Sequence, residues 1–170
     1  MAAQMDPTVM IGGTLPLLHA GHRVGKGDTI ILESCEYCNS FLSFRPTTAV
    51  ILDIEADHLD FFKDLADVEN SFRRFADLVP AEDGIVVANA DDRNTMDTLD
   101  GLNRNVITFG LGSYADVYCE NLEYVGGVGH FDLMRDGEKL THVELSVPGK
   151  HNVKNALAAA AAALTIGVPP

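Results

Sequence analysis

Four short apolar runs alternate with more polar segments between residues 28 and 110. The runs are DTIILE (28–33), TTAVILDI (47–54), GIVVANA (84–90) and NVITFG (105–110). Nearly continuous apolar runs of this length are typical of parallel strands that are covered on both faces. Between them, segment 64–79 has apolar residues at helical spacing and ends before Pro80, and segment 92–99 predicts a shorter helix. We therefore expect an α/β fold with a mostly parallel sheet flanked by helices.

The pattern changes from residue 115 onward. ADVYCENLEYV, GHFDLMRDG and KLTHVELSV are strand-like and closely spaced, and Asp136-Gly137 between the last two is a strong hairpin signal. We expect a small antiparallel sheet over 115–147, attached to the parallel one. Segment 149–167 begins in polar residues and continues through six alanines, which predicts a helix that lies close to the sheet. The length of 170 residues fits a single domain, 1–170.

Composition limits the classes of partner. Apolar residues make up 46% of the chain and the formal net charge is −13. This acidity argues against a nucleic-acid partner, whose phosphates need a basic surface. Nucleotides remain possible, because backbone amides and magnesium can hold their phosphates. No apolar run approaches the ~20 residues of a membrane span and no signal peptide is evident, so we expect no membrane partner and a cytoplasmic location.

The three cysteines are Cys35, Cys38 and Cys119. An odd number does not suggest a disulfide framework. Cys35 and Cys38 form a C-x-x-C pair, but a structural zinc site needs four ligands and Cys119 lies far away in a predicted strand. We expect buried thiols rather than a redox pair or a zinc site.

Polar residues follow two of the predicted strands. Glu33 closes strand 28–33, and Glu55, Asp57 and His58 follow strand 47–54. Ligands of doubly wound sheets bind outside the carboxyl ends of the strands, so neighbouring strands would place Glu33 and His58 in one crevice. Together they could hold a divalent ion that also binds phosphates. The alternative is a solvated acidic loop in which His58 caps a helix.

GKHNVKN (149–155) is a second candidate site. Asn152 and Asn155 are three residues apart on a helix and share a face. Their amides both donate and accept hydrogen bonds, which suits the edge of a nucleobase, although an asparagine that caps the helix is the simpler interpretation. No phosphate-binding loop of the form G-x-x-x-x-G-K-[ST] occurs, since GHRVGKGD (21–28) and VPGKHN both depart from it.

Three blocks of sequence resemble the central domain of the Mur ligases. ESCEYCNSF, IEADHLD and PGKHNVKNALA occur in the order and approximate spacing of that family, and DPTVMIGG near the start also fits. The resemblance covers essentially the whole chain and is nearest to the member that acts on UDP-N-acetylmuramate and L-alanine. It implies a fold related to the P-loop NTPases.

The resemblance also implies a chemistry. Glu33 and His58 would be catalytic residues on Mg²⁺ ions that bridge ATP and the substrate carboxylate. His151, Asn152 and Asn155 would meet the adenine. ATP would convert the carboxylate of UDP-N-acetylmuramate into an acyl phosphate, which the amine of L-alanine attacks during peptidoglycan precursor synthesis. Several anionic groups meet in such a site, which explains the need for metal ions.

The chain departs from the family pattern at its start, and this departure leaves two hypotheses about its function. The family carries a glycine-rich loop ahead of the DPT segment, and this chain begins with MAAQMDPT. We expect a fragment of an ATP-dependent ligase that is inactive alone. The alternative is a non-catalytic binding or interaction module that kept the fold without the phosphate loop.

Overall fold

The computed structural model describes residues 3–170, which form two compact units, 3–36 and 37–170. The first unit is a three-stranded sheet with the order β2-β1-β3. β1 pairs antiparallel with β2 and parallel with β3. None of its described residues is buried, and its contacts are backbone ladders and polar contacts such as the Arg23–Asp6 ion pair. Its strands are β1 (Thr8–Leu15), β2 (Ala20–Arg23) and β3 (Ile30–Leu32).

The position of β3 corrects one expectation. The sequence predicts a covered strand over 28–33, whose end would share a crevice with the end of 47–54 if the two strands are neighbours. Instead β3 pairs with β1, whereas residues 48–51 belong to the sheet of the second unit. Ile30 is 64% exposed. The apolar run correctly predicts a strand, but its pairing depends on residues elsewhere in the chain, which a local pattern cannot identify.

The second unit contains a six-stranded sheet with the order β4-β5-β6-β7-β8-β9. The strands from β4 to β7 pair in parallel, and β7, β8 and β9 pair antiparallel. The expected α/β class, with parallel strands and an antiparallel extension, is confirmed. The strands are β4 (Thr48–Ile51), β5 (Ile85–Asn89), β6 (Asn105–Gly110), β7 (Val117–Val125), β8 (Val128–Arg135) and β9 (Glu138–Pro148).

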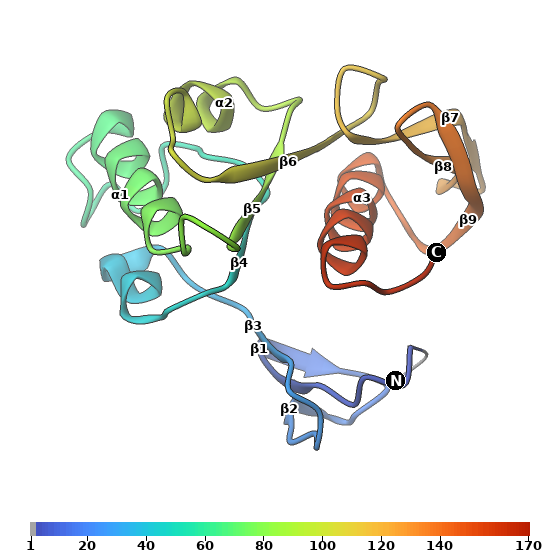
Figure 1. The fold of residues 1–170 in the computed structure, drawn as a ribbon, viewed down its shortest axis with the longest axis horizontal. Helices are drawn as coiled ribbons and strands as arrows, with labels where there is room; N and C mark the ends of the chain where they lie inside the picture. Colours follow the sequence, from blue (N-terminus) through green and yellow to red (C-terminus); the bar gives the residue numbers. More distant parts are fainter. Residues whose placement is uncertain (1–2) are drawn as a thin grey trace. The chain divides into compact units, whose positions relative to one another are not determined.

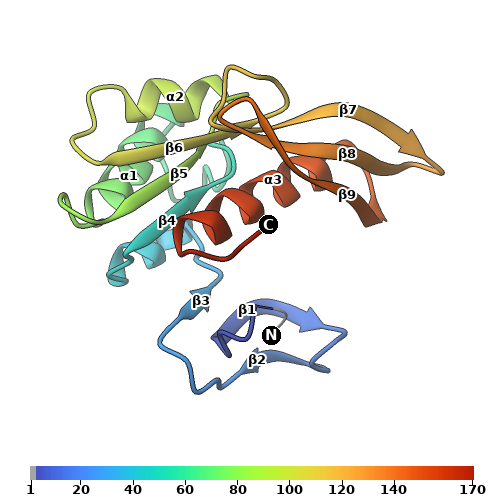
Figure 2. The same cartoon turned by 45° about the vertical axis from the view of Figure 1, so that its right-hand side comes forward.

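Helices cover both faces of this sheet, with α1 (Leu65–Asp77) and α2 (Arg93–Leu99) on one and α3 (Lys150–Thr165) on the other (Figures 1 and 2). Asp64 caps α1 by accepting from the backbone N–H of Asp67, and Asp92 caps α2 in the same way through Thr95. The short 3₁₀ segment η1 (Tyr37–Ser43) completes the unit. None of the described helices is long and apolar enough to cross a membrane.

Each face of the sheet has its own hydrophobic core. Residues of η1, β4 and α1, including Phe41, Ile51 and Phe75, form one core. The other contains Phe131 and Leu157 and lies under α3. Of the six consecutive alanines, Ala158 and Ala161 are buried and Ala159 is exposed, which is the three-residue period of a helix face.

Two sequence expectations about turns and cysteines have different outcomes. Asp136 (φ 53°) and Gly137 (φ 79°) both have left-handed backbone between β8 and β9, so the predicted hairpin is confirmed. Cys119 is buried as expected, but Cys35 and Cys38 are exposed, so the expectation of buried thiols is wrong for that pair. Cys35 lies between β3 and η1, and Cys38 lies within η1, so neither belongs to a covered strand. The apolar character of cysteine does not by itself show where in the fold the residue lies.

Candidate functional site at the carboxyl edge of the sheet

A cleft opens in the second unit where β4, β5 and β6 end and α3 begins. Open α/β sheets bind ligands outside the carboxyl ends of their strands, and this cleft has that position. Most of its lining is polar, contributed by the loops after β4 and β5 and by the first turns of α3. The lining residues are Leu52, Asp53, Glu55, Asn89, Asp91, Asp92, Phe109, His151, Lys154 and Asn155.

Partly buried side-chain hydrogen bonds fix the two loops that form one wall of the cleft. Asn89, 3% exposed at the end of β5, donates from Nδ2 to the carbonyl oxygen of Leu52 at 2.7 Å. Its Oδ1 accepts from the backbone N–H of Asp91 at 2.9 Å. Asp92 Oδ2 accepts from the backbone N–H of Ile54 at 3.1 Å. The loop after β4 is therefore joined to the loop after β5, and the wall is preorganised.

Asp91 connects this wall to α3. Its carboxylate accepts from the backbone N–H of Leu111 at 3.2 Å, forms an ion pair with Lys154 Nζ at 3.3 Å, and accepts from the hydroxyl of Tyr114. The hydrogen bond to Asp91 raises the pKa of Tyr114 to about 12. A Cβ on Gly110 would lie 2.9 Å from Asp91 Oδ1, so glycine gives the carboxylate room.

Two of the three residues predicted to meet a nucleobase line the cleft. His151 and Asn155 are both exposed at the start of α3. Asn155 donates to Oδ1 of Asn152 at 3.4 Å, which confirms that the two asparagines share a helix face. Asn152 is not in the lining, and its Nδ2 donates to the carbonyl oxygen of Pro148 at 2.7 Å. The helix cap is Gly149, so neither asparagine has the simple capping role.

Glu33 lies in the first unit, directly after β3. It is exposed, and its Oε2 accepts from the backbone N–H of Gly12 at 2.9 Å. The proposed route to a shared crevice, through neighbouring strands, is wrong, because β3 and β4 belong to different sheets. The pairing of Glu33 with His58 on one metal stays a prediction.

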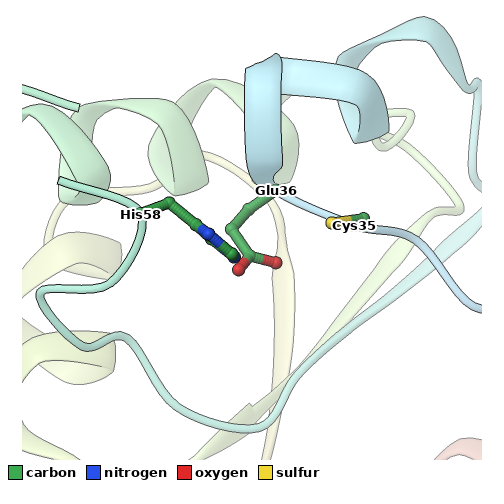
Figure 3. A group of neighbouring side chains, drawn as sticks. All are labelled: Cys35, Glu36 and His58. Atoms are coloured by element: carbon green, nitrogen blue, oxygen red, sulfur yellow. The ribbon is translucent and has the colours of Figure 1, made fainter. Parts of the chain in front are cut away.

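His58 lies in the second unit, on the loop between β4 and α1, and its side chain is labelled in Figure 3. Its backbone is left-handed, with φ of 54°, and its N–H donates to Oδ1 of Asp57 at 2.7 Å. The ring centroid lies 4.8 Å from that of Tyr37. Left-handed backbone is unfavourable for residues with a Cβ and is concentrated at functional sites.

Sequence reasoning missed seven of the ten residues that line the cleft, among them three whose polar contacts organise it. Asn89 and Asp91 stand at and just beyond the end of strand GIVVANA, and Lys154 lies between the two asparagines of α3. Glu33 and His58 were chosen because they are polar residues that follow a predicted covered strand, where ligands of α/β sheets bind. Asn89 and Asp91 meet the same criterion. Lys154 carries no such signal, because only the fold brings it to Asp91.

Residues 14–163 match the family described as Mur ligase middle domain. The UDP-N-acetylmuramate–L-alanine ligase of Clostridium novyi (strain NT) is 44% identical over 169 residues, which cover 99% of this chain and 36% of that protein. The chain therefore spans about a third of the length of that relative.

Two solved structures have the same fold. The UDP-N-acetylmuramate:L-alanyl-γ-D-glutamyl-meso-diaminopimelate ligase from Neisseria meningitidis aligns with a TM-score of 0.84 at 29% identity, over 98% of this chain and 55% of that one. The UDP-N-acetylmuramate-alanine ligase MurC of Thermotoga maritima aligns with a TM-score of 0.78 at 26% identity, over 96% and 36%.

Proposed function

We propose a function for this chain from the family to which it belongs, the Mur ligases, whose middle domain it represents. The chain is the ATP-binding centre of a ligase that joins L-alanine to UDP-N-acetylmuramate in peptidoglycan precursor synthesis. One observation carries the proposal: the cleft at the carboxyl edge of the sheet contains His151 and Asn155, which by the family resemblance would meet the nucleotide. The 44% identity to a ligase of that name supports the choice of substrates.

The cleft fits an adenine base. Asn155 uses one N–H toward Asn152 and retains an amide oxygen and a second N–H for the edge of a base. The exposed imidazole of His151 offers an aromatic face on which a base can stack. The Asp91–Lys154 ion pair fixes the start of α3 against the loop after β5, which holds these two side chains in place.

The family resemblance implies that Glu33 and His58 hold Mg²⁺ ions, on which nucleotide phosphates supply oxygen ligands as well. When bound, ATP and Mg²⁺ would supply the phosphoryl group that activates the substrate carboxylate and the positive charge that neutralises it. The chain's own contribution is to orient the nucleotide and to place compensating charge where negative charge develops.

A chimera tests this function. The matched segment of the Clostridium novyi ligase is replaced by residues 1–170, and phosphate release from ATP is measured with UDP-N-acetylmuramate, with and without L-alanine. We expect phosphate release that requires both substrates. A soluble, folded chimera that binds ATP but releases no alanine-dependent phosphate would contradict the proposal.

Variants of the chimera separate the assigned roles. Asn155→Ala should raise KM for ATP with a smaller effect on kcat, because it removes a contact to the base. Glu33→Gln and His58→Asn should each lower kcat by about 10²–10³, the usual cost of losing one preorganised electrostatic group. Matched controls are Asn103→Ala and Glu82→Gln, two exposed positions outside the cleft lining. Equal effects in the control variants would show that the changes act through folding.

The 170-residue chain alone should bind a nucleotide weakly and catalyse no ligation. The sequence of 170 residues contains no G-x-x-x-x-G-K-[ST] segment, and the curated relative with the same fold region is about three times as long. Alanine-dependent phosphate release by the purified chain would contradict this expectation, whereas a complete lack of nucleotide binding would contradict the assignment of the cleft.

A further inference from the structure

Two histidines and a glutamate share one face of the β8–β9 ribbon. His130 on β8 is directly opposite Glu144 on β9, and Asp132 is directly opposite His142. Side chains alternate along a strand, and the intervening residue Phe131 is buried in the core under α3. The polar side chains therefore lie on the face of the sheet that is turned away from α3.

The three side chains are close enough to share an ion. His130, His142 and Glu144 each offer one ligand atom, and these atoms lie within 4.8 Å of one another. Ligands around a tetrahedral zinc ion are about 3.4 Å apart, since each lies about 2.0–2.2 Å from the metal. Small rotamer changes would bring the ligand atoms from within 4.8 Å of one another to the spacing around zinc. None of the three side chains is buried, so they can make such changes.

Asp132 orients one of these ligands. Its Oδ1 lies 2.7 Å from Nδ1 of His142 and 2.7 Å from Nζ of Lys139, and its Oδ2 accepts from Asn121 at 2.9 Å. Asp132 is only 7% exposed, so this carboxylate is a fixed acceptor. When Nδ1–H of His142 donates to it, Nε2 carries the lone pair. A carboxylate that holds the second nitrogen of a histidine is the usual support for a metal-binding imidazole.

We propose that His130, His142 and Glu144 form a binding site for one transition-metal ion of the zinc class. Two imidazoles and one carboxylate are a donor set that zinc uses with three protein ligands, and a water molecule completes the tetrahedron. Magnesium and calcium prefer oxygen ligands throughout, so the two imidazoles select against them. Glu123 on β7, opposite His130, adds negative charge beside the ion.

The site is separate from the proposed nucleotide cleft. None of its ligands lines the cleft, and all three come from the antiparallel strands. Bound zinc would join β8 to β9 and stabilise the folded protein by mass action, because the unfolded chain does not hold the three ligands together. Zinc binding at these residues therefore does not depend on the ligase function.

Zinc binding is measured on the untagged 170-residue chain after treatment with a chelator and dialysis, by isothermal titration calorimetry and by metal analysis. We expect one Zn²⁺ per chain and a rise in melting temperature when zinc is added. His130→Ala, His142→Ala and Glu144→Gln should each weaken binding at least about tenfold. Glu144→Gln is nearly isosteric at an exposed position, so it tests the site even if a histidine variant folds poorly.

Three further variants test whether zinc binds at these residues and not elsewhere on the chain. Asp132→Asn should weaken zinc binding by about 10–100-fold, as expected for a residue that positions a ligand. Its melting temperature without metal shows how much of the effect is structural. His22→Ala and the double variant Cys35→Ser/Cys38→Ser should bind zinc like the unmodified chain. Loss of binding in the cysteine variant, unchanged binding in all three ligand variants, or no measurable binding by the unmodified chain would overturn the proposal.

Discussion

Tyr114 shows how one hydrogen bond changes a proton equilibrium at the edge of the cleft. Its hydroxyl donates to Asp91, and this bond raises the pKa of Tyr114 to about 12 from the ordinary value of 10.0. The folded protein thus holds the phenolic proton more tightly than the unfolded chain. The stabilisation is complete below pH 10 and is lost as the pH rises through about 12. Because Tyr114 is 68% exposed, water screens the pair and the effect on stability stays small.

The first prediction follows from this shift. In an ultraviolet titration of tyrosinate formation, Tyr37 and Tyr114 should both ionise above the ordinary range, because each hydroxyl donates to a carboxylate, and Tyr114→Phe should remove the step near pH 12. Tyr124→Phe, at another exposed tyrosine, is the matched control and should leave the step in place. If Tyr114→Phe removes only a step near the ordinary value, the hydrogen bond to Asp91 does not exist in solution.

The second prediction concerns the backbone of His58. Its φ of 54° places a residue with a Cβ in the left-handed region, which costs about 1–2 kcal/mol relative to right-handed backbone. His58→Gly should therefore be more stable than His58→Ala by about 1 kcal/mol, since both variants lack the imidazole and only alanine keeps the strain. Urea denaturation of the two variants measures the difference. Greater stability of the alanine variant would exclude the left-handed conformation.

Helix α3 gives the clearest link between a sequence run and its packing. Ala161 is 0% exposed against the sheet, whereas Ala159 in the same run is exposed. The third prediction is that Ala161→Leu lowers the free energy of unfolding by about 1–3 kcal/mol, the usual cost of overfilling a packed core. Ala159→Leu is the same substitution on the exposed face and should change stability by no more than about 0.5 kcal/mol. Equal effects at the two positions would contradict the assignment of the buried face.

Elements with strong local signals were predictable from the sequence. Helix α1 is found by its apolar period and by Pro80 after its end, and the β8–β9 turn by Asp136-Gly137. The β1–β2 hairpin was missed, because its strands contain glycines and have no clear alternation of apolar and polar residues. The pairing of β3 was predicted wrongly, since the partner of a strand is a non-local property.

In the candidate site, too, local features were predictable from the sequence and contacts between distant residues were not. Asn155 was identified by its residue type and its helical spacing from Asn152, and His151 through the resemblance of GKHNVKN to the family's segment. The contact between Asp91 and Lys154 joins residues more than sixty positions apart, so no sequence pattern could reveal it. The rule that ligands bind outside the carboxyl ends of parallel strands was applied only to segments 28–33 and 47–54. It also applies to the end of β5, where Asn89 and Asp91 line the cleft.

The two units of the molecule differ in how they are stabilised. All buried apolar residues belong to the second unit, from Phe41 onward, among the residues that the structure describes. In the described part of the first unit, no side chain is buried, and the apolar strand β3 is exposed along its whole length. Burial of apolar surface is the main favourable term in folding, so the backbone hydrogen bonds of β1, β2 and β3 have little packing to protect them.

The last prediction is that hydrogen–deuterium exchange separates the two units. Amides of β5 and β6 should exchange only through global unfolding, because Val86, Val87 and Phe109 are 0% exposed in the centre of the sheet. Amides of β1 and β3 should exchange orders of magnitude faster, through local opening that leaves the second unit folded. Mass spectrometry of peptides from both units, under conditions where opening is rapid and reversible, provides the comparison. Equal protection in β1 and β5 would show that the first unit is stabilised as strongly as the second, and that exposure within the unit does not govern its opening.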